Sequence, residues 1–261
     1  CELMLKPCGL MDYQTIDVAR SAEGLRLVLN AGVPGPWSEA AKALFNHHNV
    51  AFIPIAQAAG GANEDLVDWT GHRNAPIAVF EAEPPRTRWI EMLDLAERLG
   101  TGPSLLPQDR AERVQAIGWV NEMAGEGGSG WSCRHLIFDV WAQKTGDDAR
   151  SSNPMFEAYR FDPALQARMM DNAKSFLKDL SQALGAGTGE YLVGDEFTVA
   201  DLYWAYFSNL LAPLPDELNP MAASSRSSYE IPGLLLAGFD LRVLEHRDLM
   251  FQRHLLTPLS F

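Results

Sequence analysis

The pattern of apolar residues changes near residue 103, and this change limits the fold more than any other feature of the sequence. Before it, short strand-like runs alternate with amphipathic helical segments. The strands are expected at 25–30, 50–56 and 77–82, and the helices at 39–48, 63–71 and 87–100. This order, with room for a small hairpin near 77–88, predicts one α/β sheet domain over residues 23–103.

After the segment GTGPSLLP at 100–107, the sequence carries almost only helical patterns. Helices are expected at 109–124, 131–145, 163–185, 198–211 and 233–255. The connector GEGGSG at 125–130 lacks the preceding strand and the lysine of a nucleotide-binding loop, so we interpret it as a plain loop. The sequence therefore predicts an all-helical domain over residues 104–261, with residues 1–22 as a leader.

The composition argues against several classes of partner. The formal net charge is −13, so the chain should repel nucleic-acid phosphates and anionic membrane surfaces. No apolar run approaches the ~18 residues of a membrane-spanning helix, and the first residues do not resemble a secretory signal. The three cysteines are an odd number, and the histidines lack the spacing of a metal site. We therefore expect a cytoplasmic protein without a disulfide framework or a metal ion.

The segment YLVGDEFTVADLYWA at 191–205 carries the most specific local signal. Thr198 can cap a helix start by accepting a hydrogen bond from the Asp201 amide, and Asp201 can reach back to the Thr198 amide. Phe197 and Leu202 occupy the two positions of a hydrophobic staple around this capping box. Because a capping box alone is a common structural device, its meaning depends on the sequence around it.

These surroundings closely resemble the glutathione S-transferase family, in which a similar segment opens a buried helix of the C-terminal domain. Pro76 in NAPIAVF and the segment DRAERVQAIGWVNEM at 109–123 match further family features, so the resemblance covers roughly residues 23–211. It implies a thioredoxin-like N-terminal domain, an all-helical C-terminal domain and a homodimer. It also implies glutathione as co-substrate and a small apolar electrophile as second substrate.

The resemblance places the sulfur of glutathione at the start of the first helix, in VPGPWSE. A free thiol, with a pKa of about 8.5, is mostly protonated at neutral pH, so the site needs a donor or a helix N-terminus to hold the thiolate. The family's Ser or Cys falls on Gly35, which has no side chain, and Ser38 becomes the candidate catalytic residue. Ser38 could instead bond to its own helix backbone, since Gly35 and Pro36 are good helix-starting residues. Trp37 could line the site or pack in the core.

The resemblance also implies that a cis peptide before Pro76 turns the backbone N–H and C=O of Ala75 toward the tripeptide. The family's acid and serine at the next helix start read Arg86 and Thr87 here, and Arg88 follows. Thr87 can replace the serine as a donor to the γ-glutamyl carboxylate. Nearby arginines could also hold a carboxylate.

The arginines are a departure from the family pattern. Arg86 would repel the ammonium group of glutathione, so Glu81, Glu83 or an acid of a partner subunit would have to take it. Alternatively, the arginines at 86 and 88 pair with Glu83 or Glu91 and bind no ligand. The sequence leaves both interpretations open.

In the helical domain, Trp131, Ser132 and Cys133 are expected near the pocket for the second substrate, although Cys133 could be a small core residue. The leading hypothesis is glutathione-dependent transfer to an apolar electrophile. One alternative is a non-catalytic member of this fold that binds a ligand or a protein partner. Another is a glutathione-dependent isomerase or dehalogenase.

Overall fold

The computed structural model describes residues 11–145, 154–186 and 190–261, which fall into two compact units. The first unit runs to Thr101 and also takes in Leu214–Ala222 and Leu256–Phe261. The second unit comprises Gly102–Pro213 and Ala223–Leu255. The tail of the chain therefore belongs with the sheet unit, although its sequence was expected to continue the helical domain.

The first unit is built on a mixed sheet with the strand order β2-β1-β3. Strand β1 (Leu25–Asn30) pairs in parallel with β2 (Phe52–Gln57) and antiparallel with β3 (Ile77–Phe80). A bridge between Ala78 and Arg86 adds a short return segment beside β3, where a hairpin was expected. The predicted strand-helix alternation is confirmed in this unit.

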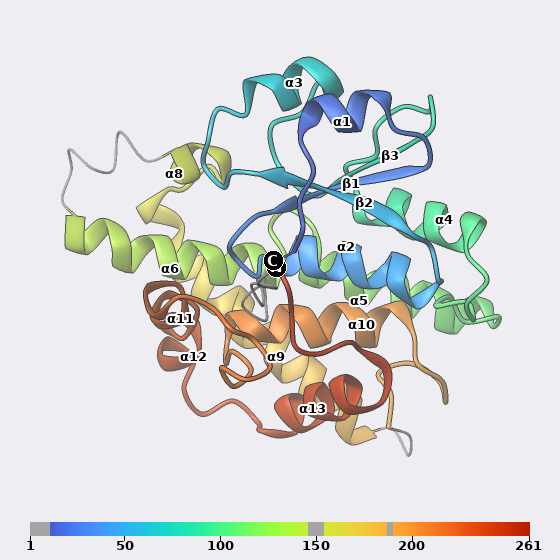
Figure 1. The fold of residues 1–261 in the computed structure, drawn as a ribbon. Helices are drawn as coiled ribbons and strands as arrows, with labels where there is room; N and C mark the ends of the chain where they lie inside the picture. The colour runs from blue at the N-terminus through green and yellow to red at the C-terminus, as the bar shows by residue number, and fades with distance from the viewer. Residues whose placement is uncertain (1–10, 146–153, 187–189) are drawn as a thin grey trace. The chain divides into compact units, whose positions relative to one another are not determined.

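Helices cover both faces of this sheet (Figure 1). Helix α2 (Pro36–His47) and helix α4 (Trp89–Leu99) lie on one face, and α1 (Ile16–Ser21) and α3 (Glu64–Thr70) lie on the other. The second face has its own apolar cluster, which includes Ala19 of α1, Val28 of β1 and Leu66 of α3. The part of the leader that the structure describes is thus an integral layer of the fold.

The second unit contains only helices among its described residues. They are α5 (Arg110–Ala124), α6 (Ser129–Thr145), α8 (Pro154–Ala158), α9 (Gln166–Ala186), α10 (Val199–Phe207), α11 (Ala223–Tyr229), α12 (Ile231–Leu235) and α13 (Arg242–His254), with 3-10 turns at Pro163–Leu165 and Ser208–Leu210. The helix expected over 233–255 is broken in two, because Gly238 adopts a φ of 95° that no helix accommodates.

The predicted capping box opens α10. The Asp201 carboxylate accepts hydrogen bonds from the amide of Thr198 (2.9 Å) and from the amide of Leu192 (2.8 Å). The Thr198 hydroxyl accepts from the Ala200 amide at 3.2 Å. Phe197 stacks on the ring of His254 with 4.3 Å between centroids, and its staple contact with Leu202 stays a prediction.

Candidate functional site

The turn between β1 and α2 is shaped by the side chain of Asn30, the last residue of β1. Gly35 is the N-cap of α2, with φ −62° and ψ 120°. A Cβ at Gly35 would lie 2.8 Å from Asn30 Oδ1, closer than real side chains approach. A side chain at Gly35, which the resemblance aligns with the family's Ser or Cys, would therefore require the Asn30 side chain to move.

The Ser38 hydroxyl is hydrogen-bonded to the same asparagine. Its hydroxyl donates to Asn30 Oδ1 at 2.9 Å and accepts from the Asn30 amide at 3.1 Å. Ser38 is only 1% exposed, so a ligand cannot approach the oxygen without moving the turn. The hydroxyl thus bonds to the end of β1, and neither to its own helix backbone nor to an open site.

The polar network under this turn continues to Gln57, which sequence analysis did not single out. Asn30 Nδ2 donates to Gln57 Oε1 at 2.5 Å, and Gln57 Nε2 donates to the carbonyl of Arg73 at 3.2 Å. Asn30 and Gln57 are register partners at the ends of β1 and β2. The signal that could have identified this network is a polar residue at the end of one expected strand, Asn30, and another directly after the next, Gln57.

The edge of β3 next to the turn carries unpaired backbone groups. The Ala75–Pro76 peptide bond is cis, as the family resemblance implied. Within the described residues, no hydrogen bond reaches the N–H or the C=O of Ala75. Since Val28 pairs with Ile77, the antiparallel register runs on toward Asn30 and Ala75, which brings this edge to the end of β1. An extended peptide can add to such an edge through main-chain hydrogen bonds.

The arginines at the start of α4 pair with acids of the same unit. Arg86 Nη2 lies 2.5 Å from Glu83 Oε2, and Arg88 Nη2 lies 2.8 Å from Glu91 Oε1. Hydrogen bonds from Arg98 and Arg86 lower the pKa of Glu83. The structure therefore contains the pairing that sequence analysis kept as the alternative.

Glu91 also covers the N-terminus of α4. Its Oε2 accepts from the amides of Thr87 (3.4 Å) and Arg88 (3.2 Å). Hydrogen bonding to Arg88 lowers the pKa of Glu91, so the carboxylate stays ionised there. Among described residues the Thr87 hydroxyl makes no hydrogen bond and remains a free donor.

The sequence from 153 to 225 matches the family model described as "Glutathione S-transferase, C-terminal domain". Solved glutathione S-transferases match most of the chain. The one from Methylobacterium radiotolerans, in complex with glutathione sulfonate, is 15% identical with a TM-score of 0.62 and covers 88% of this chain and 91% of its own. The chain shares the fold of the glutathione S-transferases.

Two further structures of this fold support the same conclusion. The transferase from Methylobacillus flagellatus, with glutathione bound, is 11% identical, has a TM-score of 0.60 and covers 88% of this chain and 95% of its own. The Pseudomonas fluorescens family member, with two glutathione molecules bound, is 16% identical, with a TM-score of 0.60 and coverage of 91% and 94%. No curated protein matches the chain. The glutathione S-transferase fold is thus shared, at very low sequence identity.

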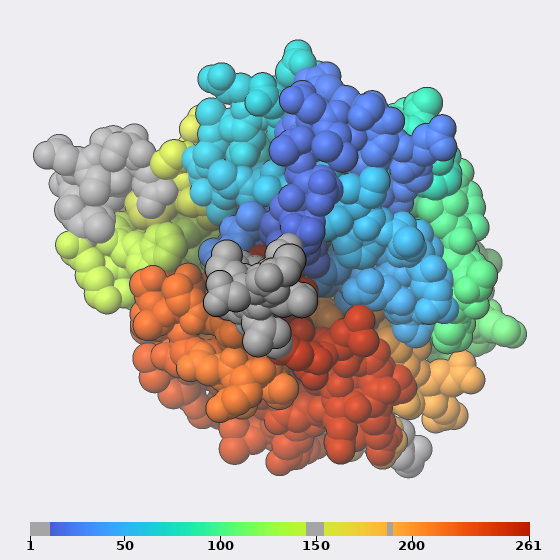
Figure 2. Space-filling view, viewed as in Figure 1, coloured from blue at the N-terminus to red at the C-terminus, as the bar shows by residue number. Residues whose placement is uncertain are grey.

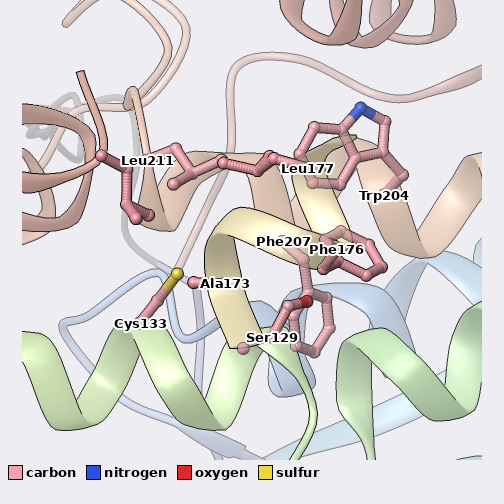
Figure 3. Close-up of a pocket in the computed structure, with 10 residues that line it drawn as sticks. Ser129, Cys133, Ala173, Phe176, Leu177, Trp204, Phe207 and Leu211 are labelled. Carbon is pink, nitrogen blue, oxygen red and sulfur yellow. The ribbon is translucent and has the colours of Figure 1, made fainter. Parts of the chain in front are cut away.

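In the helical unit, the three residues expected at the second-substrate pocket do not line one common cavity: Cys133 lines a small one, and Trp131 and Ser132 do not. Cys133 is 5% exposed and lines a cavity of only about 10 Å³, with Ser129 on the same helix and Phe176 and Leu177 on α9 (Figure 3). A cavity of this size holds about one water molecule and no substrate. Burial raises the pKa of Cys133 to about 12, so its thiol stays protonated. These properties are typical of a core cysteine, the alternative that the sequence had left open.

The neighbours of Cys133 are not part of that cavity. Ser132 is fully buried, and its hydroxyl donates to the Gly128 carbonyl (3.0 Å) and accepts from Asn172 Nδ2 (2.8 Å). The Trp131 ring packs against Tyr159 with 4.8 Å between centroids.

In the described part of the chain, no cluster of His, Cys, Asp and Glu could hold a metal ion. Across the same residues, no helix has both the length and the apolar character needed to cross a membrane.

Proposed function

We propose that the protein binds glutathione along the β3 edge and transfers it to an apolar electrophile. The observation that carries this proposal is the Ala75 backbone, whose N–H and C=O are unpaired beside the cis-Pro76 peptide. These two groups would take the cysteinyl unit of the tripeptide as an added strand. The complexes of the M. radiotolerans and M. flagellatus proteins with glutathione sulfonate and glutathione support this choice of ligand.

In this proposal the thiolate is held by the N-terminus of α2. The first turn of a helix has N–H groups without intrahelical partners, and the helix dipole favours an anion there. Gly35 brings no side chain of its own to this turn, where the Asn30 side chain fills the adjacent space, and Trp37 is half-buried beside it. Ser38 acts here as a support for Asn30, since its only proton is already donated.

The γ-glutamyl end would lie at the start of α4. The Thr87 hydroxyl is the available donor for its carboxylate, and Glu83 or Glu91 would meet its ammonium group. Arg86 and Arg88 are bound to these acids and would hold them in place. The resemblance also implies a homodimer, which light scattering of the purified protein would test. The cysteine usage favours a cytoplasmic location.

Calorimetric titration with glutathione tests the proposal, followed by a conjugation assay with an aromatic chloronitro electrophile. Thr87→Val should weaken binding about tenfold, because one hydrogen bond to a carboxylate is lost. Thr101→Val is the matched control, since Thr101 is exposed beyond the end of α4. Absence of binding at millimolar glutathione, or equal affinities for the two variants, would contradict the site.

A second candidate is a non-catalytic member of the fold. Two hydrogen-bonding arrangements favour it. Glu91 accepts from the amides at the start of α4, and the Ser38 hydroxyl donates to Asn30, so fewer polar groups are left to bind a ligand. Glutathione binding without conjugate formation would support this second function. Turnover of the electrophile without net conjugate would instead indicate isomerase or dehalogenase chemistry.

A further inference from the structure

Two segments outside the family-like core contact β1 and α2: residues 11–21 reach the end of β1, and the tail reaches the middle of α2. Residues 11–21 lie on the surface of the first unit, in dark blue in Figure 2. From this segment the Tyr13 hydroxyl donates to the carbonyl of Asn30 at 3.2 Å. From the tail, the carbonyl of Ser260 accepts from Lys42 Nζ at 2.5 Å, and Figure 1 shows the C-terminus beside the start of α2.

Between these contacts lies a buried ion pair on α2. Lys42 Nζ lies 2.9 Å from Glu39 Oε1 and 2.7 Å from Oε2, and the two residues are 6% and 2% exposed. Burial raises the pKa of Glu39, and the charge of Lys42 opposes this shift. Burial, and then the charge of Glu39, raise the pKa of the Tyr13 phenol. Glu39 therefore depends on Lys42 for its charge balance.

The tail that completes this pair is itself anchored in the first unit. Leu259 and Phe261 are 3% and 4% exposed, and the Leu259 amide donates to the carbonyl of Leu218 at 2.8 Å. Leu256, three residues earlier, is 68% exposed. The anchoring thus belongs to the last residues of the chain, which bring the Ser260 carbonyl to Lys42.

We propose that Lys42 is a positioning residue for the thiolate site, tied to the tail through Ser260 and neutralising Glu39. Glu39 lies in the first turn of α2, where a negative charge would reduce the positive potential of the helix N-terminus. Lys42, one turn later on the same side, cancels that charge, so the N-terminus stays able to attract the sulfur. This inference rests on the proposed function for its ligand, but not for the anchoring of the tail.

The charge balance is tested by the pKa of the thiol of bound glutathione, followed through the ultraviolet absorbance of the thiolate. Glu39→Gln leaves Lys42 unopposed and should lower this pKa by about one pH unit, as expected for a charge roughly 10 Å away at an effective dielectric constant of about 20. Lys42→Met should leave it equal or higher, and the double variant should resemble the unaltered protein. Structural damage would move both single variants in the same direction. Such a result, or an unchanged pKa in Glu39→Gln, would overturn the proposal.

The anchoring is tested without any ligand by hydrogen exchange of the folded protein. Leu259→Asp should displace the tail and speed exchange of the amides of residues 39–43, whereas Leu256→Asp at the exposed position should not. Lys42→Arg keeps the positive charge, so exchange of the same amides should remain as slow as in the unaltered protein. This variant therefore provides a second measurement if Leu259→Asp fails to fold. Unchanged exchange in Leu259→Asp would overturn the anchoring. Failure of the unaltered protein to bind glutathione would instead contradict the proposed function and leave the exchange result standing.

Discussion

Nε2 of His246 lies 3.0 Å from Oδ1 of Asp201, and both side chains are buried in the second unit. Asp201 is fully buried, and the same carboxylate holds the amides of Leu192 and Thr198. The capping box of α10 is therefore linked to α13, which contributes His246. Asp201 therefore both caps the start of α10 and connects this helix to a residue 45 positions later in the same unit.

Asp201→Asn should destabilise the protein by about 3 kcal/mol, because an amide donor would replace an acceptor that serves several buried donors. Urea denaturation at neutral pH measures this change. Asp195→Asn is a suitable control, since Asp195 is exposed a few residues before the helix. Equal midpoints for the two variants would show that the buried carboxylate is not a determinant of stability.

Gly35→Ser should destabilise the protein by about 1–3 kcal/mol, because the new Cβ would collide with the side-chain oxygen of Asn30. Placing serine at the family's activating position should therefore not improve catalysis by itself. Asn30→Ala in the same chain should recover part of the loss, so that the two changes are not additive. Additive free energies of unfolding would argue against the collision.

Ser38→Ala should lower stability by about 1–3 kcal/mol, since the partly buried backbone amide of Asn30 would lose its acceptor. The affinity for glutathione should change less than about threefold, because the hydroxyl is already bonded inside the protein. Denaturation and calorimetry on the same preparation separate the two effects. A large loss of affinity or turnover with unchanged stability would restore Ser38 as the catalytic group.

Glu91→Gln tests the pH dependence of the α4 start. The pKa of Glu91 is lowered in the folded state, so its ionised form stabilises the fold above the unfolded pKa of about 4.3, and this contribution is lost as the pH falls through the folded pKa. The unaltered protein should therefore melt at a higher temperature than Glu91→Gln at pH 7. The difference should shrink progressively below about pH 4. A difference that is constant with pH would contradict ionisation as its cause.

Cys133 should resist alkylation in the folded protein. Its side chain is 5% exposed and burial raises its pKa to about 12, so very little reactive thiolate forms at neutral pH. Peptide mapping after treatment with iodoacetamide should show modification of Cys133 only in denaturant. Rapid labelling under native conditions would instead indicate an accessible pocket at this position.

The sequence by itself determined the alternation of strands and helices up to residue 103, the helical pattern beyond it and the capping box at Thr198 and Asp201. These features depend on residues a few positions apart, so periodicity and helix-start chemistry are enough to predict them. The same local reasoning missed α1 in the leader and joined α12 to α13, because one short helix and one glycine turn leave little periodic signal.

Only the tertiary structure decided what the candidate site residues do. Ser38 meets Asn30 across the β1–α2 turn, and Lys42 meets Ser260 across 218 positions of the chain. A hydroxyl or an ammonium group bonds to whatever partner the fold brings within about 3 Å, and no pattern of neighbouring residues specifies that partner. The family resemblance therefore pointed to the edge at Pro76, while long-range packing determined which polar groups remain free beside it.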